Sequence, residues 1–380
     1  MAKNRSFQPA SSPHVSAQAQ AGKPRKIFYW VLILLCLGSV EAVGQIIYFV
    51  KFQPQERKLM AAYMGLGSGY DPDMVSNYHP HPYLVYVLNP NVKWNYRSYF
   101  GIEPKQMING QGYRGKEFLV AKPKDVYRIV CMGGSTTFGL GEPDETMTYP
   151  AQLEAGLNRA LPGRHFEVIN AGTPGWSSAE SLINLHFRIL ELSPDMIIIY
   201  EGINDTFAMR KPEEGKSDNS NFRKIVNYKM PNAFARFWLR LSAACRLMYY
   251  WTTDDIAFDI NSLAVKASPP GFSEIDALNK ATGKYFRRNL ETIVAIAKAH
   301  HIKPVLVTMG HGPWHPSLGL TCRLVRDVAA AESVPLVDFE RYSRPGYFDI
   351  DNVHLLRDGN AALAHVIADT LIKNGTLRSD

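Results

Sequence analysis

The longest apolar segment of the chain is IFYWVLILLCLGSVEAVGQIIYFV, residues 27–50. At 24 residues it is long enough to cross a hydrocarbon core of about 30 Å as a helix. Arg25 and Lys26 precede it, so the positive-inside rule leaves residues 1–26 in the cytoplasm and the rest of the chain outside. The pattern predicts a single-pass signal anchor in the cytoplasmic (inner) membrane. Residues 1–26 lack apolar periodicity and are expected to be a disordered cytoplasmic tail.

The same segment allows two other interpretations. VEA at 40–42 has the small-residue pattern of a signal-peptidase site, so a cleaved signal peptide is one alternative. A buried core helix is the other. Glu41 weakens a membrane span, because a carboxylate in mid-bilayer costs roughly a few kcal/mol unless it is protonated or paired. Both the anchor and the cleaved peptide export the remainder of the chain.

From residue 126 onward, short apolar runs alternate with helically patterned stretches. The runs predict strands over 127–132, 166–169, 196–200, 304–309 and 336–339. The stretches predict helices over 149–161, 179–192, 286–297, 320–331 and 363–371. Such alternation indicates βαβ units with right-handed crossovers. We therefore expect residues 126–375 to form a three-layer α/β/α domain around a mostly parallel five-stranded sheet.

Two further regions interrupt or precede this domain. Residues 51–125 are rich in Tyr and Pro and are expected to be a stem and N-terminal extension, with a strand-like run at 83–88. Residues 206–280 are expected to be an insertion. Within it, apolar residues recur at helical spacing: Phe234, Phe237 or Trp238, Leu241, Cys245 and Met248. Such a helix could cover an acyl-binding groove, contact the membrane surface or pack on its own domain, and the sequence leaves all three open.

Composition excludes several classes of protein. The net charge is +7, but residues 1–26 carry +5 of it, so the body is nearly neutral and a nucleic-acid surface is not expected. No C-x-x-C pair occurs, and His79 and His81 lack a third ligand at metal-site spacing. We expect no metal and no cofactor. Cys245 and Cys322 could pair in an oxidising compartment, although the sequence does not show that they are close.

Polar, Gly-rich segments follow the predicted strands. They are GGSTTFG (133–139), NAGTPGWS (170–177), EGIND (201–205) and DNVHL (351–355). Each alone has an ordinary explanation as a tight turn, a helix cap or a chance pair. A phosphate loop is excluded for the first, because Leu140 follows Gly139 where Lys is needed. Because ligands bind at the carboxyl ends of parallel strands, the segments together predict a site. His311 and His315, after the fourth strand, could line that site or form an ordinary polar loop.

In this order, the four segments resemble the blocks of the SGNH (GDSL-type) hydrolase family of esterases and acyl hydrolases. The resemblance covers about residues 126–375 and implies a flavodoxin-like sheet. It implies that Ser135 is the nucleophile and that Asp351 and His354 complete the triad. The oxyanion hole would be formed by Ser135, Gly175 and Asn204. One departure is Gly134, where the family name implies Asp. INGQGYRGKE (108–117) also looks like the lead-in of membrane-associated bacterial relatives.

The residue types suit acyl transfer independently of the resemblance. A serine hydroxyl needs an adjacent base, and a histidine with a pKa of about 6.5 can serve at neutral pH. We therefore expect an extracytoplasmic serine esterase acting on an O-acetyl group of an envelope glycan or on a lipid acyl ester. The alternatives are an O-acyltransferase acting on a polysaccharide, or a catalytically idle scaffold module of an envelope complex. Protein partners are not indicated.

Overall fold

The computed structural model describes residues 23–52, 77–92, 108–211, 214, 215, 217, 233–252, 273–312 and 318–377. The described residues belong to two compact units, one of residues 1–53 and 229–255 and one of residues 54–228 and 256–380. Most of the predicted tail, and parts of the predicted stem and insertion, lie outside the described residues.

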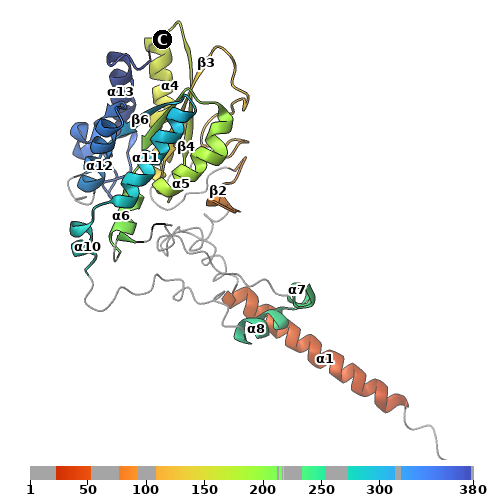
Figure 1. Cartoon of the computed structure of the whole chain (residues 1–380). Coiled ribbons are helices and arrows are strands. Elements are labelled where there is room, and N and C mark those ends of the chain that lie inside the picture. The colour runs from red at the N-terminus through yellow and green to blue at the C-terminus, as the bar shows by residue number, and fades with distance from the viewer. Residues whose placement is uncertain are drawn as a thin grey trace, which may run out of the picture. The chain divides into compact units, whose positions relative to one another are not determined.

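The larger unit contains a five-stranded sheet in which every pair of neighbours is parallel (Figure 1). The strands are β3 (Val126–Gly133), β4 (His165–Gly172), β5 (Met196–Tyr200), β6 (Lys303–Val307) and β7 (Leu336–Val337), and their spatial order is β4-β3-β5-β6-β7. All five residues of β5 are buried, as a central parallel strand covered on both faces requires. The predicted sheet is confirmed. The last strand is shorter than predicted, because a 3₁₀ turn begins at Phe339.

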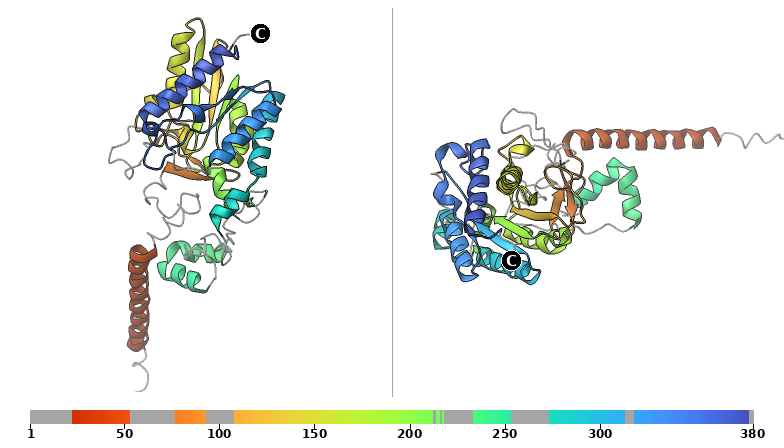
Figure 2. Two further views of the ribbon diagram at one scale, coloured as in Figure 1. Left: turned by 90° about the vertical axis from the view of Figure 1, so that its left-hand side faces the viewer. Right: turned by 90° about the horizontal axis from the view of Figure 1, so that it is seen from above.

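Helices cover both faces of this sheet, as Figures 1 and 2 show. On one face, alternate β3 residues Ile129 and Cys131 pack in a cluster with α4 (Tyr149–Ala160) and α13 (Arg357–Lys373). On the other face, Val130 and Met132 pack with α11 (Lys284–Ala299). The period-2 alternation of the strand therefore divides one apolar run between two cores. The α12 helix (Leu318–Ala331) contributes residues to both.

The larger unit also contains several short helices among its described residues. They are α3 (Ser135–Phe138), η3 (Glu145–Met147), α5 (Ser178–Asn184), α6 (Ile203–Met209), α10 (Glu274–Lys280), η7 (Phe339–Tyr342) and η8 (Pro345–Tyr347). The helix predicted over 179–192 begins as α5 and continues as a π-turn at Leu185–Ile189 and a 3₁₀ turn at Leu190–Leu192.

An antiparallel hairpin upstream of the sheet joins the same unit. It consists of β1 (Tyr78–His81) and β2 (Val85–Leu88). Its buried residues form a cluster with Phe138 and Trp176, which lie on the segments that follow β3 and β4. The sequence indicated only a strand-like run at 83–88. The packing shows that this upstream region supports the carboxyl edge of the sheet.

The smaller unit contains the predicted apolar helix. It is α1 (Lys23–Ile47), continued by a π-helical turn at Tyr48–Phe52, and the stretch Lys26–Val50 is long and apolar enough to span a membrane. Its large apolar side chains are exposed. The helical stretch predicted near 234–248 is two helices, α7 (Ala233–Leu241) and α8 (Ala243–Thr252), separated at Ser242. The α8 helix packs against α1.

Candidate active site

The first predicted site residue lies where strand β3 is followed by a short helix. β3 ends at Gly133, and Ser135 is the first residue of α3. β3 and β5 are neighbours at the point where the order of the strands reverses, which is where ligands bind in sheets of this type. Ser135 is buried, with 8% of its surface exposed. Its backbone N–H belongs to the first turn of α3 and therefore has no acceptor within the helix.

Gly134, the departure from the family pattern, has a steric explanation in this chain. A Cβ at this position would lie 2.9 Å from Nδ2 of Asn204 and 2.9 Å from the carbonyl oxygen of Trp176. Both contacts are too short for a real Cβ, so the atoms on both sides would have to shift. A side chain before the nucleophile is therefore incompatible with the observed position of the Asn204 amide.

His354 and Asp351 come from the loop between η8 and α13. His354 Nε2 lies 2.7 Å from the hydroxyl oxygen of Ser135, although the two residues are 219 positions apart in the sequence. On the other side of the ring, His354 Nδ1 is hydrogen-bonded to Oδ2 of Asp351. The structure thus brings these three predicted residues into one chain of hydrogen bonds. In this arrangement Nδ1 carries the proton donated to Asp351, and Nε2 is ready to accept the proton of Ser135.

The Asp351 carboxylate is held in its ionised form. Its Oδ1 accepts backbone N–H groups from Val353 at 2.9 Å and from His354 at 3.0 Å. Burial alone would raise the pKa of Asp351, but hydrogen bonds from His354 and Val353 outweigh it and hold that pKa well below its usual range. The charge is therefore present at neutral pH, where it can orient the imidazole and stabilise an imidazolium.

The predicted oxyanion donors lie at the ends of three adjacent strands. Asn204 is the second residue of α6, and its Nδ2 donates a hydrogen bond of 2.7 Å to the carbonyl oxygen of Trp176. That bond uses one of its two amide hydrogens, so the other can donate to a substrate oxygen. Gly175 lies in the turn after β4 with φ of +83°, a conformation that favours glycine. Together with the N–H of Ser135, these groups can stabilise a tetrahedral oxyanion.

Two buried carboxyl groups on either side of Asn204 support its position, and the sequence analysis did not identify them. Asp205 accepts the hydroxyl of Ser178 at 2.5 Å and its backbone N–H at 3.1 Å. Glu201 accepts the hydroxyl of Ser181. Burial raises the pKa of both carboxyl groups. Both partners lie on α5, so these contacts join the start of α6 to α5.

Arg114 supports the nucleophile turn and was also missed. Its side chain is buried and donates hydrogen bonds to the carbonyl oxygens of Phe138 (2.5 Å), Gly139 (2.7 Å) and Glu142 (2.6 Å). Helix C-termini leave carbonyl oxygens without intrahelical donors, and Arg114 satisfies them just after α3. It lies in the 108–117 segment noted above, but no local pattern distinguishes a buried arginine from an exposed one.

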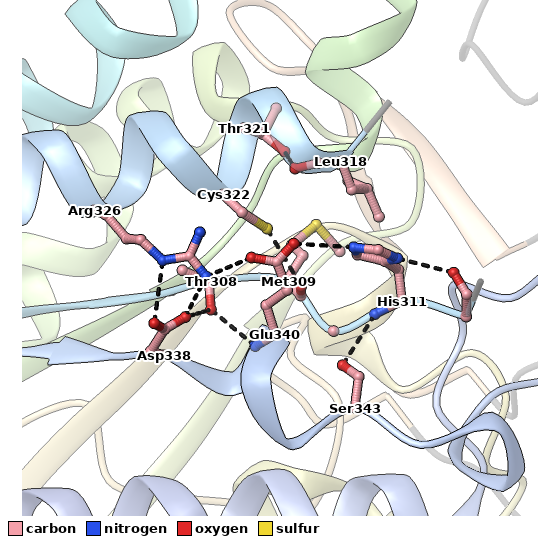
Figure 3. Close-up of polar contacts among 12 residues, drawn as sticks. Thr308, Met309, His311, Leu318, Thr321, Cys322, Arg326, Asp338, Glu340 and Ser343 are labelled. Atoms are coloured by element: carbon pink, nitrogen blue, oxygen red, sulfur yellow. Dashed lines mark hydrogen bonds and ion pairs between the residues drawn. The ribbon is translucent and has the colours of Figure 1, made fainter. Parts of the chain in front are cut away.

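A second polar cluster lies at the carboxyl end of β6 (Figure 3). His311 Nδ1 is 2.9 Å from the Gly312 carbonyl oxygen, and its Nε2 is 3.2 Å from Oε1 of Glu340, which also pairs with Arg326 of α12. The Gly312 N–H donates to the carbonyl oxygen of Asn352 at 2.9 Å. Because Asn352 follows Asp351, the cluster supports the loop that carries Asp351 and His354. His315 lies outside the described residues.

His79 and His81, which the sequence raised as a possible metal pair, make polar contacts with other residues. His79 lies 2.8 Å from Oδ1 of Asn89, and His81 accepts the backbone N–H of Leu84 at 3.1 Å. Among the residues that the structure describes, no group of three or more His, Cys, Asp or Glu side chains is placed to hold a metal ion. Cys245 and Cys322 are free thiols.

Comparison with known proteins identifies one family. Residues 131–362 match the model of the GDSL-like lipase/acylhydrolase family, and all five predicted site residues lie within that range. No curated protein sequence matches the chain.

Several solved structures are similar in fold. TesA is 18% identical, with a TM-score of 0.40 over 64% of this chain and 97% of that one. LAE5, an alpha/beta hydrolase from the metagenome of Lake Arreo, Spain, is 19% identical, with a TM-score of 0.40 over 67% and 97%. A lipase/acylhydrolase from Enterococcus faecalis is 18% identical, with a TM-score of 0.38 over 65% and 96%.

Proposed function

Because the chain belongs to the GDSL-like lipase/acylhydrolase family, whose members are serine ester hydrolases, we propose that it hydrolyses a carboxylic ester outside the cytoplasm through an acyl-serine intermediate. The observation that carries the proposal is the distance of 2.7 Å between the Ser135 hydroxyl and Nε2 of His354, with Asp351 bound to the opposite ring nitrogen. This is the geometry that an activated serine nucleophile needs.

The reaction follows from the contacts of these residues. His354 removes the proton of Ser135 as its oxygen attacks the ester carbonyl carbon. The carbonyl oxygen becomes an oxyanion that accepts hydrogen bonds from the N–H of Ser135, the N–H of Gly175 and the Asn204 amide. His354 then returns the proton to the leaving alcohol, and an acyl-serine remains. Water, deprotonated by the same histidine, then attacks the acyl group. The bond between the acyl carbon and the Ser135 oxygen breaks, His354 returns the proton to that oxygen, and the acid is released.

We propose that the helix containing residues 27–50 anchors the enzyme in the cytoplasmic membrane with the hydrolase domain outside. This placement is supported by the length of the helix, its apolar composition, its exposed side chains and the cationic residues before it. Because of this location, we propose that the substrate is an O-acetyl group of an envelope glycan or an acyl ester of a lipid.

The test is ester turnover by the full-length protein purified in detergent. The panel contains nitrophenyl esters of short and long acyl chains, acetylated glycans and phospholipids, and Ser135→Ala is the matched control. We expect release of acid from at least one class, abolished by Ser135→Ala, and labelling of Ser135 by a fluorophosphonate. If the wild-type protein and the Ser135→Ala variant release equal amounts of acid from every ester, the proposal is wrong. Transfer of acetyl to an added sugar, exceeding release to water, would identify an acyltransferase instead.

A further inference from the structure

The apolar helix α1 contains one carboxylate, that of Glu41, at a position where a membrane-spanning helix is expected to be apolar. Glu41 lies nine residues before Val50, the last residue of the potential membrane span. At a rise of 1.5 Å per residue, this places it about 13 Å along the helix from that end. An ionisable side chain inside a bilayer is costly and normally has a partner within the protein.

That partner is the N-terminus of α8, about two hundred residues later in the sequence. The carboxylate oxygens of Glu41 accept the hydroxyl of Ser242 at 2.6 Å, the N–H of Ala243 at 2.7 Å and the N–H of Ala244 at 3.4 Å. The first N–H groups of a helix lack intrahelical acceptors, and a negative charge beside them is favourable. Glu41 therefore caps α8 from a different helix.

One turn further along α1, Gly44 allows the two helices to approach closely. A Cβ at Gly44 would lie 2.9 Å from the backbone nitrogen of Ala244. By contrast, a Cβ at Gly38 of the same helix would have no neighbour within 4 Å. Small residues at such positions are typical of helix pairs that pack in a membrane. Glu41 and Gly44 thus form one docking surface for α8.

The helix that precedes α8 carries an apolar face that the protein leaves exposed. Phe234, Phe237, Trp238 and Leu241 lie on α7 at i, i+3, i+4 and i+7, and their exposed fractions are 75%, 56%, 45% and 60%. Met248 of α8 is exposed as well. A continuous apolar face of this kind marks a contact with a protein or a lipid.

We propose that α7 and α8 form a membrane-embedded element of the outer leaflet, docked on α1 by Glu41 and Gly44, with the exposed face of α7 in contact with lipid acyl chains. The proposal rests on the proposed anchoring of the chain by residues 27–50. Ser242 lies 2.6 Å from Glu41 and therefore at the same depth in the membrane. The chain would then enter the membrane twice, at α1 and again at 233–252.

The composition of α7 and α8 favours lipid over a protein partner. These helices combine aromatic and aliphatic residues with three arginines, Arg236, Arg240 and Arg246, and contain no acidic residue. Arginines on membrane helices can extend toward the phosphates of the headgroups while their methylene groups remain in apolar surroundings.

The lipid contact is tested with the full-length protein reconstituted in vesicles of phosphatidylcholine that carries bromine on its acyl chains, which quenches nearby fluorophores. Single cysteines, labelled with bimane, replace Phe237 on α7, Leu34 on α1 or Ile275 on α10, in a background without Cys36 and Cys245. Leu34 and Ile275 are 65% and 72% exposed. We expect quenching at 237 comparable to that at 34, and little at 275.

The three labels separate the two proposals. If the label at 34 is quenched and the label at 237 behaves as that at 275 does, α7 is outside the bilayer and this inference is wrong, while the anchor stands. If the label at 34 is not quenched, the anchor itself is wrong, and this inference fails with it.

The docking surface is tested by the reactivity of Cys245, which is half-buried in the first turn of α8, in a Cys36→Ser background. Gly44→Ala places a methyl group against the backbone of Ala244, and Glu41→Leu removes the capping carboxylate. Each should raise the rate of maleimide labelling of Cys245 by about tenfold, which corresponds to about 1.4 kcal/mol of docking free energy. Gly38→Ala is the matched control and should leave the rate unchanged. Equal rates in Gly44→Ala, Glu41→Leu and Gly38→Ala would show that α8 does not dock at this surface.

Discussion

Replacing Gly134 with alanine tests whether the Asn204 amide stabilises the oxyanion. The added Cβ would lie 2.9 Å from Nδ2 of Asn204 and 2.9 Å from the carbonyl oxygen of Trp176. Ordinary van der Waals contact of a Cβ begins at 3.4 Å, so each contact must lengthen by roughly 0.5 Å or more. A hydrogen bond of 2.7 Å joins these two neighbours and orients the amide. The substitution therefore misplaces the amide without removing it.

The size of the effect follows from what a misplaced donor loses. Removing one oxyanion donor typically lowers kcat by about 10²–10³-fold, and a displacement of about 1 Å can cost about 10²-fold. We expect Gly134→Ala to lower kcat by about 10²-fold or more. KM should change little, because the donor acts mainly in the transition state.

The assay is ester hydrolysis by the full-length variants, with circular dichroism to confirm that each is folded. Gly156→Ala, on α4, is the matched control, because a Cβ there has no neighbour within 4 Å and should leave kcat unchanged. Asn204→Ala should reproduce the loss, and the double variant of Gly134 and Asn204 should be hardly worse than either single variant. Near wild-type turnover in Gly134→Ala, or fully additive losses in the double variant, would refute the steric argument.

Three further predictions concern the triad, the buried Arg114 and the buried Asp205. Ser135→Ala and His354→Ala should each remove nearly all turnover, and the double variant should lose little more. The reason is that both residues act in one proton transfer. Additive losses in the double variant would contradict this prediction. Arg114→Leu should lower the free energy of unfolding in urea by about 3–5 kcal/mol, because three carbonyl oxygens lose a buried donor. Lys116→Ala is the control. It breaks an exposed ion pair and should lower the free energy of unfolding by under about 1 kcal/mol. Burial raises the pKa of the Asp205 carboxyl group in the folded protein. Its protonated form therefore stabilises the fold fully below about pH 4, and this stabilisation is lost as pH rises through the higher folded-state pKa. Asp205→Asn should therefore flatten the fall of Tm above about pH 4, and parallel Tm curves for the variant and the wild type would show that Asp205 does not titrate in this way.

Much of the catalytic unit follows from local patterns in the sequence. Runs such as MIIIY at 196–200 are apolar on both faces, which is typical of a central parallel strand covered on both sides. Because the carboxyl ends of parallel strands meet at one edge, the segments after them were expected to converge. The structure brings Ser135 and His354 together at that edge across 219 residues of sequence.

Tertiary structure alone decided the contacts that depend on distant backbone. The steric need for Gly134 appears only when Asn204 and Trp176 are placed beside it by two other strands. Arg114 is charged, and nothing in its neighbourhood predicts burial against the carbonyl oxygens that follow α3. Glu41 counted against a membrane span when considered within its own helix. Its partners, the N–H groups at the start of α8, belong to a segment about two hundred residues away, and hydropathy along one helix carries no information about a cap supplied by another.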